Sequence, residues 1–282
     1  MKILYMGTAA DERIPAMFCN CVNCQKAIRF AGKNVMTRSQ ALIDNKLLVD
    51  FGGDTYFHFL RQGKTLWDIE NILLTHSHAD HFSMEQFSAR YHWQSAQTAK
   101  YPTLNLYASQ DLIDKVWRAV DSLKMEKEMI ERFWIFHAVK AFEKFVVDGY
   151  TITPLSARHA GEENAFVYLI EKDGKTLFYG NDTGTFDDTI DNWLADNNKY
   201  IDMLSLDCTK GDRETPYYGH MSMSEGRAIA DRFLAKGIID NKTRLYYTHF
   251  AHGCGMVYDE LKIVAKEKYS FEITYDGLQV EL

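Results

Sequence analysis

Three histidines and one aspartate stand within six residues in the stretch ILLTHSHADH, as His76, His78, Asp80 and His81. In an extended strand, side chains two residues apart point to the same face, so His76 and His78 share one side. A turn after them lets Asp80 and His81 reach a neighbouring point. Because imidazole and carboxylate groups are ligands for Zn, Mn and Fe, this spacing predicts two adjacent metal ions. The simpler alternative is a loop of hydrogen-bonded histidines.

Four more candidate residues follow or flank strand-like runs and lie in polar or glycine-bearing loops. They are His159 in SARH, Asp182 in YGNDTG, His220 in YYGHMSM and His249 in THFAH. Rigid scaffolds commonly present catalytic groups on such loops. The remaining histidines His58, His92 and His137 lack this setting, and we interpret them as surface or core residues.

The stretch CNCVNC brings together Cys19, Cys21 and Cys24, which we call the cysteine knuckle. Three thiolates need only one more nitrogen or sulfur ligand to complete a tetrahedral structural zinc site. The candidates for that fourth position are Cys208, Cys254 and His252. An odd total of five cysteines favours metal binding in a reducing compartment over a disulfide framework.

Composition narrows the class of protein. The chain has 282 residues, 46% hydrophobic and 25% charged, which is typical of a globular protein. A net charge of −7 does not favour nucleic acid as the partner and is compatible with a small-molecule substrate. The start MKILYMG reads as a strand rather than a signal peptide, and no stretch approaches the ~20 apolar residues of a membrane span. We therefore predict a cytoplasmic protein with no membrane partner, for which a homodimer is a possible assembly.

The elements that must position these side chains alternate along the chain. Apolar runs rich in β-branched and aromatic residues predict strands at KILYM, ALIDNKLLVD, IENILLTH, TLNLYA, AFVYLIE, TLFYG, YIDMLSL, RLYYTH and FEITYDGLQVEL. Helical patterns fall at about 24–32, 83–96, 109–127, 186–195, 222–236 and 257–268. This order favours an α/β fold in which helices cover packed sheets.

The sequence shows no linker or low-complexity run, so we predict a single domain over residues 1–282. Its segment 109–144 is rich in helical patterns with balanced charges, and we interpret it as a helix-rich insertion. Whether that insertion is a lid or only structural stays open at this stage.

Together, the H-x-H-x-D-H motif, the later histidine, the aspartate of the G-x-D-T loop and the final histidine resemble the metallo-β-lactamase superfamily. The resemblance implies an αββα four-layer sandwich. It implies that His76, His78 and His159 hold one metal, that Asp80, His81 and His249 hold a second, and that Asp182 bridges them. Asp50, after KLLV, matches an early aspartate that orients a ligand histidine from outside the metal shell. The alternative for Asp50 is a turn aspartate before two glycines.

Within the superfamily, the cysteine knuckle and the T-H-x-x-H stretch resemble the PhnP-like phosphodiesterases of the carbon-phosphorus lyase pathway. In that family the second histidine of the pair completes the zinc site, which here implies His252. The pair Asp207 and His220 resembles the carboxylate and histidine with which phosphodiesterases and ribonuclease Z protonate the leaving oxygen. The resemblance thus implies catalytic roles for His220, Asp207 and Asp80. Lys210 and Arg213, between Asp207 and His220, could clamp a phosphate or simply be solvated.

From this we expect a dinuclear metal-dependent hydrolase, a phosphodiesterase that cleaves a small phosphodiester with a hydroxide generated at two divalent ions, Mn or Zn and possibly Fe. One structural Zn would occupy the knuckle. Two alternatives stay open. One is an ester, thioester or lactam hydrolase of the same fold. The other is a non-catalytic metal-binding accessory protein like the pyrroloquinoline quinone biosynthesis protein B.

Overall fold

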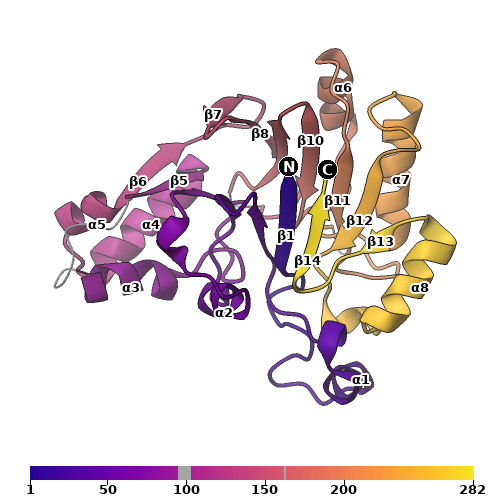
Figure 1. The fold of residues 1–282 in the computed structure, drawn as a ribbon, viewed down its shortest axis with the longest axis horizontal. Helices are drawn as coiled ribbons and strands as arrows, with labels where there is room; N and C mark the ends of the chain where they lie inside the picture. The colour runs from indigo at the N-terminus through magenta and orange to yellow at the C-terminus, as the bar shows by residue number, and fades with distance from the viewer. Residues whose placement is uncertain (95–102, 162, 217) are drawn as a thin grey trace.

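The computed structural model describes residues 1–94, 103–161, 163–216 and 218–282, without the side chains of residues 92–94. Within these residues the chain forms two seven-stranded sheets that stack face to face, with helices on their outer faces (Figure 1). The two ends of the chain lie on neighbouring strands, β1 and β14 (Figure 1).

The two sheets repeat one pattern of strand directions. In the order β14-β1-β2-β3-β4-β5-β6, pairs up to β2-β3 are antiparallel and the later pairs are parallel. In the order β7-β8-β9-β10-β11-β12-β13, pairs up to β9-β10 are antiparallel and the later ones parallel. The bounds in the first sheet are β1 Lys2–Gly7, β2 Gln40–Ile43, β3 Leu47–Val49, β4 Asn71–Leu73, β5 Leu104–Ala108, β6 Trp134–Ala138 and β14 Leu278–Glu281. Those in the second are β7 Phe145–Val147, β8 Tyr150–Ser156, β9 Phe166–Lys172, β10 Lys175–Gly180, β11 Met203–Asp207, β12 Arg244–Thr248 and β13 Glu272–Ile273.

Helices form the two outer layers. Figure 1 shows α3, α4 and α5 beside β5 and β6, and α7 and α8 beside β12 and β13. The bounds are α1 Val22–Phe30, α2 Thr55–Arg61, α3 Met84–Gln94, α4 Gln110–Ser122, α5 Lys127–Phe133, α6 Asp188–Asp196, α7 Met223–Ala235 and α8 Tyr258–Tyr269. Short 3-10 helices span Gly32–Asn34, Leu66–Asp68 and His252–Cys254.

Three apolar clusters separate these layers. Tyr5, Tyr168 and Tyr179 are fully buried in the cluster between the two sheets. A second cluster lies under α4, which contributes Leu112 and Val116, and a third lies under α6, α7 and α8. The predicted αββα sandwich is therefore confirmed. Among the described residues, no helix is both long enough and apolar enough to cross a bilayer.

The predicted helices are all present with shifted ends, although residues 95 and 96 of the second one lie outside the described residues. Helices α2 and α5 and strands β6, β7 and β8 were not predicted. The turn Asp148-Gly149 between β7 and β8 has positive φ at both residues, 50° and 78°, as a two-residue hairpin requires. That Asp-Gly signal was available in the sequence and was overlooked.

Two predicted regions are more complex than their patterns indicate. Segment 109–144 contains α4, α5 and the edge strand β6, and β6 pairs with β5 over its whole length. The final run FEITYDGLQVEL forms β13 in one sheet and β14 in the other, so it links the two sheets at their edges. Local periodicity does not specify which sheet a short strand joins.

Candidate metal centre

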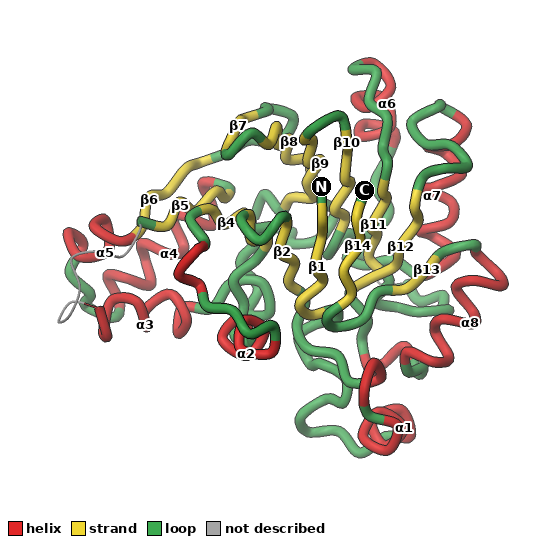
Figure 2. Tube along the Cα trace, in the orientation of Figure 1, coloured by secondary structure: helices red, strands yellow, loops and turns green. Residues whose placement is uncertain are grey.

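The candidate residues follow the carboxyl ends of strands. Asp50 comes directly after β3, His76 three residues after β4, His159 three after β8, Asp182 two after β10 and His249 directly after β12. Figure 2 shows loops gathered at the end of the sheets nearest α1 and α2. Because parallel strands end at one edge, residues far apart in the sequence converge there.

The first group consists of His76, His78 and His159, whose nitrogen donors all lie within 4.8 Å of one another. The Nε2 atom of His159 faces His78 Nδ1 at 3.0 Å. His159 Nδ1 donates to the carbonyl oxygen of Gly219 at 2.8 Å, which leaves its Nε2 unprotonated in the neutral ring. His76 is buried, and its Nε2 has no hydrogen-bond partner.

The second group consists of Asp80, His81, Asp182 and His249, all buried and with donor atoms again within 4.8 Å of one another. The Nε2 atoms of His81 and His249 and Oδ2 of Asp182 have no hydrogen-bond partner. Yet His249 Nε2 lies 3.0 Å from Asp182 Oδ2, and His81 Nε2 also contacts that oxygen. The atoms are close without hydrogen-bond alignment, which is the arrangement of ligands directed at a shared ion.

Asp182 faces both groups. Its Oδ1 lies 3.9 Å from His159 Nε2, while its Oδ2 contacts His81 and His249. The structure thus brings together the two ligand sets implied by the family resemblance and places Asp182 between them. Buried unpartnered nitrogens and oxygens of this type suit Zn, Mn or Fe ions.

The outer nitrogens of these histidines are held by neighbouring groups. Asp50 Oδ2 accepts from His81 Nδ1 at 2.7 Å, and its Oδ1 accepts from the backbone and hydroxyl of Thr75, both at 2.9 Å. The Thr75 hydroxyl also contacts His76 Nδ1 at 3.0 Å. Asp50 therefore has the predicted orienting geometry. Thr75 was missed, although its place directly before His76 is a weak signal.

Three residues of the centre have backbone conformations that L-residues rarely adopt. The φ angles are 69° at Asp50, 46° at Asp182 and 62° at His249. Each such conformation costs on the order of 1–3 kcal/mol and persists only where the surrounding structure enforces it. Strain at these positions, at strand ends in a cluster of buried ligands, is what a functional site commonly shows.

The buried charges are strongly coupled. Burial opposes charge on His249, but Asp182 and Asp80 raise its pKa to about 10. Burial likewise opposes charge on His81, and Asp182, Asp80 and Asp50 raise its pKa well above the usual value. Burial would raise the pKa of Asp182, yet His249 and His81 hold it well below the usual value. Protons and metal ions would therefore compete for the same negatively charged pocket.

His220 and Asp207 lie beside the two groups. Asp207 Oδ2 accepts from His220 Nδ1 at 2.8 Å, and the Thr209 hydroxyl lies 3.0 Å from that nitrogen. The same hydroxyl contacts His249 Nδ1 at 2.8 Å and donates to Asp207 Oδ2. Burial would lower the pKa of His220, but Asp207 raises it above the ordinary value. The predicted pairing is present, and Thr209, which joins it to His249, was not predicted.

A cavity of about 390 Å³ opens over the centre. Its walls include candidate ligands from both groups, together with His220, Thr209, Asp11 and Glu12. Lys210 and Arg213 do not line it. Lys210 is buried and pairs with Glu225 at 3.0 Å, and Arg213 Nη1 donates to the carbonyl oxygen of Gly253. Neither residue has the geometry of a phosphate clamp in this site.

The other histidines with described side chains have structural contacts. His58 is buried between Gln40 and Thr37, with both ring nitrogens at 2.7 Å from them. His137 lies in β6, stacks on Tyr107 and contacts Asn105 at 3.0 Å. The side chain of His92 lies outside the described residues.

The cysteine knuckle lies where α1 meets the 3-10 helix at His252. The Sγ atoms of Cys19, Cys21 and Cys24 lie within 4.8 Å of one another. His252 is outside that group, but its Nδ1 is buried without a hydrogen-bond partner, and its carbonyl oxygen accepts from Asn23 at 3.0 Å. Cys208 and Cys254 are buried core residues. His252 as fourth ligand stays a prediction.

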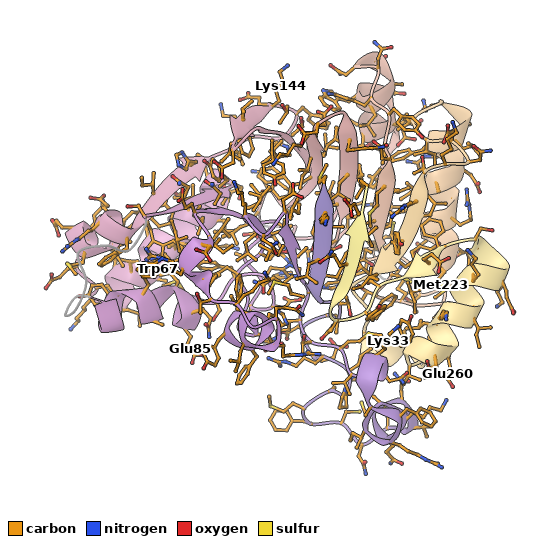
Figure 3. All side chains as sticks on the ribbon, viewed as in Figure 1. Lys33, Trp67, Glu85, Lys144, Met223 and Glu260 are labelled. Atoms are coloured by element: carbon orange, nitrogen blue, oxygen red, sulfur yellow. The ribbon has the colours of Figure 1, made fainter. Side chains whose placement is uncertain are left out.

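The region around the knuckle contacts the last helix, α8, through polar side chains. Lys26 of α1 pairs with Glu260 of α8, and Asn34 donates to Asp259 at 2.9 Å. Figure 3 shows Lys33 and Glu260 near each other at this junction. A metal held by the knuckle and His252 would join the amino-terminal segment to the loop after β12, beside these contacts with the last helix.

Replacing His252 with alanine is expected to release the knuckle zinc and lower the melting temperature, while the ions of the His/Asp centre remain. The reason is that His249 belongs to the second ligand group of the centre, whereas His252, three residues later, does not. Metal content per chain by mass spectrometry, before and after the substitution, measures this. Retention of the full knuckle zinc would contradict the assignment.

Replacing Gly52 with alanine is expected to destabilise the fold by about 2 kcal/mol or more, because a Cβ there would lie 1.9 Å from the carbonyl oxygen of Asp80. The loop that carries Asp80 and His81 would have to move, so metal affinity should fall too. Gly53→Ala is the matched control, since its Cβ would meet only the flexible end of Arg38 at 3.2 Å. Denaturant unfolding of both variants checks this, and equal stability would contradict it.

Comparison with known proteins places the chain in a protein family. A family model described as "Anti-Pycsar protein Apyc1" matches residues 25–225, which include His76 to His220. The chain belongs to this family. The match begins after the knuckle and ends before His249. The resemblances noted in the sequence did not include this family. No curated protein sequence matches the chain significantly.

Solved structures share the fold over the whole chain. A diphosphatase from the PhnP family has a TM-score of 0.74 at 20% identity and covers 100% of this chain and 98% of its own. Zn²⁺-bound PqqB from Methylobacterium extorquens has a TM-score of 0.74 at 17% identity, covering 100% of both chains. The short form of human tRNase Z has a TM-score of 0.65 at 15% identity, covering 100% and 99%. The metallo-β-lactamase fold is confirmed, with a PhnP-family enzyme among its similar structures.

Proposed function

We propose that this protein is a dinuclear metal-dependent hydrolase that cleaves a small phosphodiester. The observation that carries the proposal is the set of unpartnered buried atoms on His76, His81, His249 and Asp182 beneath a cavity that His220 also lines. Such atoms are costly to bury unless something satisfies them, and two divalent cations would do so.

Each residue then has a defined task. His76, His78 and His159 would hold one ion, Asp80, His81 and His249 the other, and Asp182 would contact both. Two divalent ions supply a deprotonated water at neutral pH and neutralise negative charge that develops on a phosphoryl oxygen. Asp50, Thr75 and Thr209 fix the ring orientations of the ligand histidines.

His220 would act as the general acid. Asp207 and Thr209 hold its Nδ1, so Nε2 is the atom from which a proton would pass to the leaving alkoxide. Asp207 fixes the tautomer and stabilises the charged ring. This role rests on the position of His220 in the cavity wall, next to His159 and His249.

The charge of the cavity favours a diester with a single phosphate. Its described wall has four carboxylates, on Asp11, Glu12, Asp80 and Asp182, and no lysine or arginine. Two divalent ions would offset those four charges, and a diester adds one negative charge. A diphosphate or polyphosphate would add more charge with no basic side chain in that wall to receive it.

The test is turnover of bis(4-nitrophenyl) phosphate by purified protein loaded with Mn or Zn. The His78→Ala variant is assayed in parallel. The proposal predicts metal-dependent release of 4-nitrophenol that His78→Ala abolishes. No turnover above the His78→Ala background with either metal would refute it. Thioester and lactam substrates assayed in parallel separate the phosphodiesterase from a carboxyl-ester or lactam hydrolase. Absence of turnover on every substrate would favour an accessory role.

A further inference from the structure

One buried carboxylate outside the ligand set joins both loops that carry the first group of histidines. Glu163 lies four residues after His159, and its side chain is 1% exposed. Its Oε1 accepts from the backbone nitrogen of Ser77 at 2.6 Å, and its Oε2 accepts from the Ser77 hydroxyl at 2.7 Å. Since Ser77 stands between His76 and His78, this carboxylate fixes the backbone between two candidate ligands.

Helix α4 completes this cluster. Lys115 Nζ donates to Glu163 Oε2 at 2.7 Å and to the Ser77 hydroxyl at 2.8 Å. One turn earlier on the helix, Asp111 Oδ2 accepts from the backbone and side chain of Asn164, at 3.0 and 2.7 Å. The loop from His159 to Asn164 is thus tied to α4 at two adjacent points.

The strength of these contacts favours a rigid clamp. Burial would raise the pKa of Glu163, but the hydrogen bonds from Lys115 and Ser77 lower it below the ordinary value. A charged acceptor that receives three short hydrogen bonds in a buried place is a strong and directional contact. No other described carboxylate outside the ligand groups accepts from the backbone between His76 and Asp80.

We propose that Glu163 is a positioning residue that locks the His76–His78 loop to the His159 loop, with Lys115 extending the clamp to α4. The inference rests on the proposed metal centre. It assigns α4, in the helix-rich segment 109–144, the role of bracing the first metal site. Glu163 touches neither substrate nor metal and acts through Ser77.

Removing the clamp should affect one ion selectively. In Glu163→Gln the ion pair with Lys115 and one acceptor oxygen are lost. The dissociation constant of the ion at the first metal site should then rise about 10–100-fold, which is the usual effect of losing a partner outside the metal shell. The second ion and the knuckle zinc should bind as in the wild type. Lys115→Met leaves both Ser77 bonds in place, so its effect should be smaller and in the same direction.

The matched control is Glu171→Gln, which breaks a Glu–Lys pair with Lys199 at 2.8 Å in β9, away from the centre. The measurement is competition with a chelator for Mn or Zn, which yields separate dissociation constants, with melting of the metal-free proteins in parallel. Selective weakening of one ion in Glu163→Gln, at a metal-free melting temperature equal to that of Glu171→Gln, supports the proposal.

Unchanged metal affinities in both Glu163→Gln and Lys115→Met would overturn it. So would uniform weakening of both ions with a lowered metal-free melting temperature, which indicates a merely structural role. This readout does not need turnover. If the wild type binds two ions but cleaves no diester, the proposed activity fails while the clamp is still tested.

Discussion

His220→Ala is expected to lower kcat on a diester with an alkyl alkoxide leaving group by about 10²–10⁴-fold, the usual contribution of a general acid. The leaving alkoxide is a strong base, so it needs the proton that His220 would donate while Asp207 holds the other ring nitrogen at 2.8 Å. With 4-nitrophenolate as leaving group the loss should be small, since that anion is stable without protonation.

The comparison of the two leaving groups is the measurement that separates proton donation from general damage. Steady-state kinetics of His220→Ala on both substrates should show the loss on the alkyl diester alone, with metal content unchanged. His137→Ala is the matched control, because that histidine lies in β6 and contacts Asn105 instead of the centre. Equal losses on both substrates would assign His220 to structure or to metal binding.

Asp182→Asn is expected to remove one or both ions of the His/Asp centre and to lower kcat/KM by more than about 100-fold. Loss of a partner outside the metal shell alone typically costs about 10–100-fold in metal affinity or activity. Asp182 is the only described carboxylate that approaches both ligand groups. An amide oxygen lacks the charge that offsets two cations. The asparagine would also leave the imidazoles of His81 and His249 buried with less compensation.

A zinc ion bound in the knuckle would provide an internal control for this variant. The cysteines lie in a different cluster from Asp182, so about one zinc per chain should remain when the catalytic ions are lost. Retention of all ions together with wild-type turnover in Asp182→Asn would exclude a bridging role. Loss of the knuckle zinc as well would indicate unfolding.

The metal centre could be predicted in stages. His76, His78, Asp80 and His81 lie in one short window, where spacing alone indicates ligands. His159, Asp182 and His249 are 78 to 168 residues further on than His81, and only the resemblance to a family assigned them to the same site. The structure shows how these residues come close together, since β8, β10 and β12 all end at one edge of their sheet.

Residues that support the ligands could not be predicted in the same way. Thr75, Thr209 and Glu163 act through hydrogen bonds, several of them to groups distant in the sequence, and one threonine or glutamate has no periodicity to detect. Strand β6 was missed for a related reason, because its short run adjoins a charged helical segment and pairing with β5 decides its conformation. The hairpin of β7 and β8 was instead overlooked, since its Asp-Gly turn is visible in the sequence.

The most direct test of the dinuclear centre is the number of metal ions per folded chain, measured by native mass spectrometry on wild type and His78→Ala. Three ions are expected in the wild type, two beneath the cavity and one in the cysteine knuckle, and His78→Ala should lose at least one of the first two. One ion per chain in the wild type after incubation with Mn and Zn would contradict a dinuclear centre and the hydrolysis proposed for it.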